Sequence, residues 1–294
     1  MFKTIAIVSL FTSAALAQSS TLIPSGISDG CSSYLNKLNS DKSFTTCTSS
    51  LITATSDYSP GSNATTTPST AKVSTTLAGF CSTSTDSNCP ESLIRGELTD
   101  FYAACSAELT SASNQDVIRI YDVLYTIAPL RAAACSKDDS GNYCVTQEKL
   151  PTSGPAAGQL QKVLSTGSPA LIPNTTTYRS NNIPFLFLQS AASAEELCNV
   201  CTRNILSAWI NFESRVPYAP GLSKSAFLSN QPDLYQSVQD TCGSTFLSGA
   251  GVQAAGGLSG GTFSSGAVQM AVGSAQGFVA AGMSILALIA SVAL

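Results

Sequence analysis

The sequence predicts an all-α fold, a disulfide-stapled bundle of about seven amphipathic helices joined by Ser/Thr/Pro/Gly loops. Three observations support this prediction. Apolar residues recur at the i, i+3 and i+4 spacing of one helix face in successive segments. Ten cysteines fall on or beside these apolar faces. Stretches rich in Pro, Gly and Ser separate the segments, as expected for loops.

Helices are expected throughout the first half of the chain. Their apolar stripes run from Cys31 to Leu38, Phe44 to Ile52, Val73 to Cys81, Ile94 to Leu109 and Val117 to Ile127. We expect Pro90 at the first position of a helix, where its missing N–H needs no partner, with Asn88 or Cys89 as the cap. Pro129 is expected to end the following helix.

In the second half, segment 151–184 is rich in Pro and Gly and predicts little regular structure. The apolar run Phe185–Leu188 fits either a buried strand or the start of a helix. Ser193 and Glu196 form a predicted capping box at the start of one helix that continues to Phe212. A last helix is expected to open with Pro232 and to include Cys242.

The N-terminus has the features of a secretory signal peptide. Lys3 provides a positive charge, an apolar run follows it, and Ala15-Leu16-Ala17 forms a small-residue cleavage site. We therefore expect residues 1–17 to be removed and the mature chain to begin at Gln18.

The C-terminus predicts a GPI anchor. No charged residue follows Asp240, and a run of small residues leads through an uncharged spacer to an apolar tail. Ser265 is the first candidate for lipid attachment and Ser264 the second. The alternative is a transmembrane helix over Phe278–Leu294, which is short for a membrane span and has no Lys or Arg after it.

These features define four predicted regions. They are a signal peptide (1–17), one cysteine-rich ectodomain (18–247) with the irregular segment 151–184, a Gly/Ser/Ala stalk (248–265) and a GPI-attachment propeptide (266–294). Without the signal peptide the chain keeps all 18 acidic residues and loses Lys3 from its 14 basic ones, which leaves a net charge of about −5. This charge argues against nucleic-acid binding. Asn63 and Asn174 begin N-glycosylation sequons.

The cysteines predict disulfide bonds and an oxidising compartment. They are Cys31, Cys47, Cys81, Cys89, Cys105, Cys135, Cys144, Cys198, Cys201 and Cys242. Seven lie before segment 151–184 and three after it, so complete pairing within the chain requires at least one bridge across that segment. Which cysteine bonds to which is left open by the sequence.

The absence of histidine excludes Ser-His-Asp and Cys-His catalysis and His-based zinc sites. Cys198-Asn199-Val200-Cys201 has the spacing of a redox or metal motif, but it lies inside a predicted helix and is expected to form structural disulfides. Asp138–Asn142 suggests a calcium loop, but Tyr143 occupies the position where an EF-hand needs Gly. We expect a solvated turn there, closed by flanking cysteines.

Glycoside hydrolysis remains chemically possible, because it needs two carboxylates in one cleft and does not require histidine. The carboxylates set in or beside apolar faces are Glu97, Asp100, Asp122 and Glu213. No nucleotide-binding glycine motif is present, and we expect no cofactor and no metal.

Several segments resemble a family of fungal secreted proteins. They are CSSYLNKLNSDKSFTTCTSSL at residue 31, LTDFYAACSAELT at residue 98, YDVLYTIAPLRAAACSKDDSGNYC at residue 121, LCNVCTRNILSAWINFES at residue 197 and LYQSVQDTCG at residue 234. That family is uncharacterised and cysteine-rich, with a signal peptide and a GPI-type tail, and the resemblance covers most of Cys31–Gly243. It implies a fungal, extracellular, helical domain and brings no catalytic residues.

The sequence therefore favours a non-catalytic, GPI-anchored protein of the cell surface or cell wall with a structural or interaction role. Its expected partners are the membrane through the lipid, and a wall polysaccharide or another surface protein. The alternative is an extracellular carrier or receptor for an apolar ligand such as a lipid or sterol, because amphipathic helices tied by disulfides can enclose an apolar cavity. A carboxylate-dependent glycoside hydrolase is the third hypothesis.

Overall fold

The structure, a computed structural model, describes residues 23–56, 70–146, 164–165, 172–173 and 175–248. The predicted signal peptide, both sequon asparagines (Asn63 and Asn174), the stalk after Ser248 and the candidate lipid-bearing serines (Ser264 and Ser265) lie outside these residues.

The described part is helical, which confirms the predicted fold class. Seven of its helices have 11 or more residues: α1 (Asp29–Asn39), α2 (Lys42–Ala54), α3 (Thr70–Phe80), α5 (Glu91–Ala104), α7 (Gln115–Ala134), α11 (Val200–Glu213) and α12 (Gln231–Cys242). The shorter ones are α4 (Thr83–Asn88), α6 (Ser106–Leu109), α9 (Thr175–Ser180) and α10 (Ala194–Leu197), with 3₁₀ turns η3 (Cys144–Thr146), η5 (Ile183–Phe185) and η6 (Leu222–Lys224).

The predicted irregular segment 151–184 contains some regular structure. Strands β1 (Leu164–Ser165) and β2 (Ile172–Pro173) pair antiparallel, with Leu164 opposite Pro173 and Ser165 opposite Ile172. Helix α9 follows directly.

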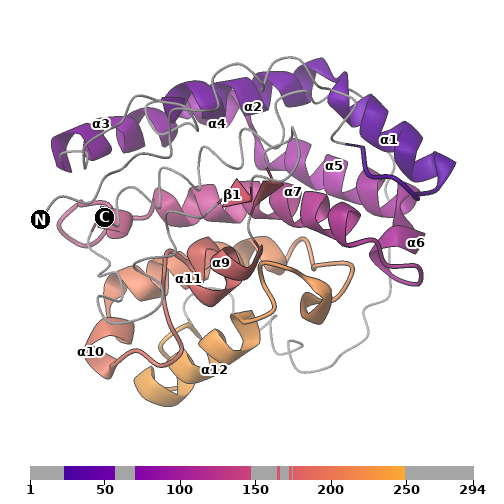
Figure 1. Ribbon diagram of the computed structural model, residues 1–294. Coiled ribbons are helices and arrows are strands. Elements are labelled where there is room, and N and C mark those ends of the chain that lie inside the picture. Colours follow the sequence, from indigo (N-terminus) through magenta and orange to yellow (C-terminus); the bar gives the residue numbers. More distant parts are fainter. Residues whose placement is uncertain (1–22, 57–69, 147–163, 166–171, 174, 249–294) are drawn as a thin grey trace, which may run out of the picture.

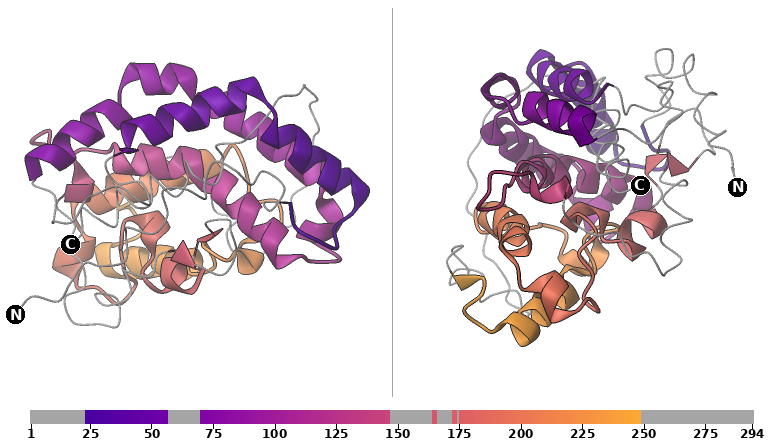
Figure 2. Two further views of the ribbon diagram at one scale, coloured as in Figure 1. Left: turned by 45° about the horizontal axis from the view of Figure 1, so that its top comes forward. Right: turned by 90° about the vertical axis from the view of Figure 1, so that its left-hand side faces the viewer.

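The helices form three groups, with α7 in the middle (Figure 1). Helices α1 to α4 lie along one side, α5 and α7 occupy the centre, and α9 to α12 lie on the other side. The end-on view in Figure 2 shows the same order. The first and last groups are thus joined through the central pair.

Helix α7 is buried on nearly all sides, as expected for a central helix. Thirteen of its 20 residues are buried, and they include Asp122 and Pro129. The prediction that Pro129 ends this helix was wrong, because the helix continues to Ala134. Proline removes one backbone hydrogen bond inside a helix. Burial of Leu130, Ala133 and Ala134 in the last turn offsets that loss.

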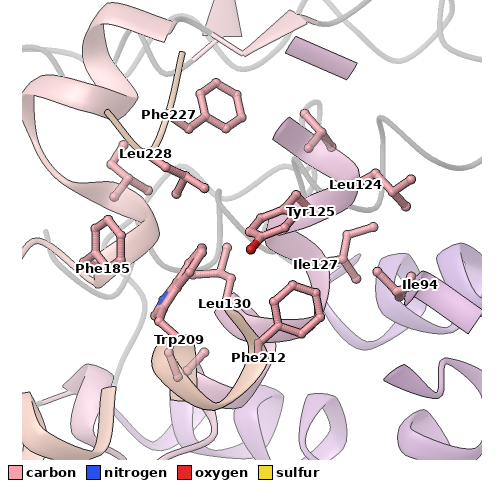
Figure 3. Close-up of a cluster of buried hydrophobic side chains, with 14 of the residues drawn as sticks. Ile94, Leu124, Tyr125, Ile127, Leu130, Phe185, Trp209, Phe212, Phe227 and Leu228 are labelled. Carbon is pink, nitrogen blue, oxygen red and sulfur yellow. The ribbon is translucent and has the colours of Figure 1, made fainter. Parts of the chain in front are cut away.

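One apolar core runs through the described chain from Cys31 to Leu247. At its centre α11 packs on α7, and Tyr125 meets Phe212 edge-on with ring centroids 5.2 Å apart (Figure 3). Trp209 lies 4.8 Å from the Phe185 ring, and its indole N–H donates to the Pro184 carbonyl at 3.1 Å. The two halves of the chain therefore share one core.

Five disulfides pair all ten cysteines. They are Cys31–Cys105, Cys47–Cys89, Cys81–Cys135, Cys144–Cys201 and Cys198–Cys242. The expectation of intrachain bridges is confirmed. Cys144–Cys201 is the bridge that joins the part before segment 151–184 to the part after it.

Two predicted helix starts need correction. Pro90 is the N-cap of α5 rather than its first residue, and it makes no side-chain cap bond. Cys89 precedes that cap and is instead the C-cap of α4, with its N–H donating to the Thr85 carbonyl and its sulfur bonded to Cys47.

The predicted helix that continues to Phe212 is divided in two. The capping box of Ser193 and Glu196 is present, but α10 ends at Leu197. Asn199 then caps α11 by accepting from the Thr202 N–H at 2.9 Å.

The apolar run Phe185–Leu188 is neither a strand nor an α-helix. After η5, Leu186 and Phe187 take positive φ values of 51° and 69°, as Asn182 does before it at 47°. Such values are rare for bulky side chains. The Asn182 side chain donates to the Leu188 carbonyl at 2.8 Å, which closes this buried loop on itself.

Candidate functional site

Three of the carboxyl groups that are shielded from solvent lie beside a tyrosine hydroxyl. Glu97 accepts from Tyr34 at 3.0 Å, and Asp122 accepts from Tyr218 at 2.6 Å. The carboxyl of Glu213 lies beside the Tyr235 hydroxyl. Within the described residues no lysine or arginine forms a salt bridge with any of the three.

Asp122 is fully buried on α7 and has the most complete set of hydrogen-bond donors. The Tyr218 hydroxyl, the Ser225 hydroxyl and the Ala226 N–H donate to it at 2.6, 2.8 and 2.7 Å. Burial raises the pKa of Asp122 to about 7, against the effect of these bonds. The network fixes the segment between α11 and α12 on the central helix.

Glu213 ends α11, and its Oε2 atom is shielded from solvent. The Gln231 amide donates to its other oxygen and to the Tyr235 hydroxyl. Burial raises the pKa of Glu213 to about 8, and the bonds from Gln231 and Tyr235 oppose that rise.

The other two predicted carboxylates, Glu97 and Asp100, are on α5. Burial raises the pKa of Glu97, and the hydrogen bond from Tyr34 opposes it. Asp100 is partly exposed, with Lys37 at 4.0 Å. Glu97 and Asp100 lie three residues apart on α5 and interact with each other and with Lys37.

A cavity of about 390 Å³ opens between the start of α7, helix α9 and the segment around η6. Its lining is polar and cationic, with Ser113, Gln115, Thr175, Arg179, Lys224 and Ser225 among the lining residues. None of the four predicted carboxylates lines it. Ser225 connects the cavity to the core, because its hydroxyl donates to buried Asp122.

Sequence reasoning missed this cavity. Its residues come from three segments that are far apart in the chain, and none of them has a motif or an unusual spacing. Only the fold brings Arg179 near Lys224.

The cysteine motif is structural, as predicted. Cys198 bonds to Cys242 and Cys201 bonds to Cys144, so the two thiols do not pair with each other. The prediction placed both inside one helix, whereas Cys198 follows α10 and Cys201 lies in the first turn of α11. The break lets the two sulfurs reach different partners.

Residues Asp138–Asn142 form a turn in which backbone N–H groups donate to the Asp138 carboxylate. Asp138 Oδ1 accepts from the N–H groups of Ser140 and Asn142 at 2.9 and 2.8 Å. An isolated antiparallel β-bridge between Lys137 and Tyr143 closes the turn. The flanking cysteines do not bond to each other, because Cys135 pairs with Cys81 and Cys144 with Cys201.

Residues 16–163 match the model of a family described as Domain of unknown function (DUF7729). The match includes α1 to α7 and ends before β1, whereas the resemblance seen in the sequence extended to Gly243. Searches for related curated proteins and for similar solved structures returned no match.

Proposed function

Because the chain belongs to the family described as Domain of unknown function (DUF7729), which assigns no activity, we propose its function from its own residues. We propose a non-catalytic, glycosylated fungal protein of the cell exterior, held by a GPI lipid on the plasma membrane or in the wall. Its role is structural or interactive, with a wall polysaccharide or another surface protein as partner.

The cysteines and the candidate carboxylates provide the strongest support for this proposal. All ten cysteines are in disulfides, which persist in oxidising compartments. None of the four candidate carboxylates lines the described cavity. A polar lining also argues against the apolar carrier, which needs an apolar cavity.

In the part of the chain that the structure describes, no helix has both the length and the apolar character needed to cross a membrane. Attachment to a membrane is therefore proposed from the tail sequence, with Ser265 or Ser264 as the lipid-bearing residue.

Expression of two chain lengths in a fungal host tests the location. The full chain should stay cell-bound and be released by a phosphatidylinositol-specific phospholipase. A chain that ends at Ser265 should appear in the medium without that treatment. Asn63→Gln and Asn174→Gln should each remove one glycan and increase gel mobility, which controls for passage through the secretory pathway.

Two results would overturn the proposal. Resistance to the phospholipase together with a cytoplasmic C-terminus would indicate a transmembrane tail. Release of sugar from wall polysaccharide that Asp122→Asn or Glu213→Gln abolishes, while the variant stays folded, would indicate a glycoside hydrolase.

A further inference from the structure

The cavity between α7, α9 and η6 collects positive charge in an acidic protein. Arg179 and Lys224 both line it, although the chain has a net charge of −4. Within the described residues neither side chain forms an ion pair with a carboxylate. No carboxylate among the described residues therefore pairs with either charge.

Lys224 is held at the cavity wall by neutral acceptors. Its ammonium group donates to the Thr110 carbonyl and lies 3.4 Å from the Ser113 hydroxyl. These contacts tie η6 to the loop before α7 and fix the position of the charge. Because both acceptors are uncharged, the ammonium keeps its attraction for an anion.

The backbone of Arg179 is hydrogen-bonded to another part of the fold. Its carbonyl accepts from the Asn230 side chain at 3.0 Å, which joins the end of α9 to the start of α12. Arg179 is exposed and lines the cavity. A guanidinium offers a planar pair of donors that matches a phosphate or a carboxylate.

Hydrogen bonds to the core hold Ser225, one of the residues that line the cavity, in place. The Ser225 hydroxyl donates to Asp122 and accepts from the N–H groups of Phe227 and Leu228 at 3.1 and 2.8 Å. Asp122 itself accepts hydrogen bonds from three donors within the protein and does not line the cavity. Asp116, in the first turn of α7, pairs with Arg119 at 3.1 Å.

The remaining lining groups suit a ligand rich in hydroxyls. Ser113, Thr175 and Ser223 supply hydroxyls and Gln115 supplies an amide, which can both donate and accept. The volume of about 390 Å³ lies in the range of small-molecule sites. We infer that this cavity binds a saccharide that carries a phosphate or carboxylate group, with Arg179 and Lys224 contacting the anion.

Calorimetric titration of the folded, oxidised chain tests this inference. The probes are glucose 6-phosphate and glucuronate, with glucose as the neutral control. At least one anionic sugar should bind, and glucose should bind at least tenfold more weakly. The anionic probe with the tighter binding identifies the preferred group.

Variants then locate the binding. Arg179→Gln and Lys224→Gln should each weaken the anionic sugar about tenfold, the size expected for one lost charge-assisted bond. Arg203→Gln on α11 removes an exposed arginine outside the cavity and should leave affinity unchanged. The Arg179 side chain makes no hydrogen bond or ion pair with the described residues, so this variant should keep the wild-type unfolding midpoint.

Three results would overturn the inference. They are no heat of binding with either anionic sugar up to about 10 mM, glucose binding as tight as the anionic sugars, or full affinity in folded Arg179→Gln. The proposed surface location does not depend on this cavity, so the phospholipase test can succeed when the titration fails.

Discussion

The buried carboxyl groups of Asp122 and Glu213 are best understood as neutral acids in the core. Removal from water disfavours the charged form, and no cation in the described residues compensates for it. Their pKa values of about 7 and about 8 leave both largely protonated in mildly acidic surroundings. The neighbouring tyrosine and amide groups can bond to the protonated form as well as to the ionised one.

This arrangement predicts that stability falls as pH rises. The folded-state pKa of each group is above its unfolded value near 4, so the folded chain binds more protons between the two values. The stabilisation is fully present below about pH 4 and is lost as pH rises through the folded values of about 7 and about 8. Glu213→Gln should reduce this loss, because glutamine does not titrate.

Urea unfolding midpoints between about pH 4 and pH 8 measure the effect. The matched control is Glu195→Gln, which removes an exposed carboxylate at the start of α10 and should keep the wild-type pH profile. Glu108, whose pKa is lowered by the Ser28 N–H, has the opposite pH dependence in every variant. The difference between wild type and Glu213→Gln therefore isolates Glu213, and identical profiles would contradict the prediction.

At the residue scale the sequence identified Asp122 and Glu213 through their apolar neighbours on helical stripes. It did not identify Tyr218, which lies 96 residues from Asp122 and bonds to it only in the folded chain. Arg179 and Lys224 were missed for the same reason. A local pattern reports which face of a helix is buried, but it does not report which distant segment covers that face.

At the scale of elements, periodicity predicted the long helices but not their interruptions. Leu197, Cys201 and Ile205 fit one helical stripe across a break, because their spacing is helical on both sides of it. The signal for the break was Asn199, a residue type that favours N-cap positions. Pro129 gave the opposite error, since tertiary burial keeps α7 helical beyond it.

Asn199 is predicted to stabilise the start of α11. Its Oδ1 accepts from the Thr202 N–H at 2.9 Å, and its side-chain amide donates to the Glu196 carbonyl at 2.7 Å. Asn199→Ala removes both bonds and should lower the free energy of unfolding by about 1 kcal/mol, with an upper value of about 2 kcal/mol.

Urea denaturation measures this difference. Asn211→Ala is the control, because Asn211 is exposed within α11 and alanine has the higher helix propensity. That variant should be neutral or slightly stabilising. Equal midpoints for Asn199→Ala and wild type would show that the cap contributes little.

At the scale of the whole molecule, the family match ends at residue 163 but the core does not. Helix α11 packs on α7, and Tyr125 donates to the Val216 carbonyl at 2.6 Å. The parity of the cysteines predicted a covalent link between the two parts, and Cys144–Cys201 provides it. The packing of α11 on α7 was not predictable, because both helices have ordinary apolar stripes.

Removal of that link separates the contribution of the bridge from that of the core. Cys144 and Cys201 are 57 residues apart, so the paired change Cys144→Ser and Cys201→Ser should cost about 4 kcal/mol from chain entropy. The shared core should still keep the two parts in one cooperative unit. Unfolding should therefore shift to lower urea but remain a single transition.

Two probes measured together decide whether the parts unfold as one. Trp209 is the single tryptophan and is fully buried on α11, so its fluorescence reports the second part. Far-ultraviolet circular dichroism reports the helices of both parts. The paired change Cys198→Ser and Cys242→Ser is the control, because it removes a bridge within the second part. Coincident curves in both variants are expected, since the α7–α11 contact remains in each. Separate curves in the Cys144/Cys201 variant alone would mean that the disulfide, rather than the shared core, makes the protein one unit.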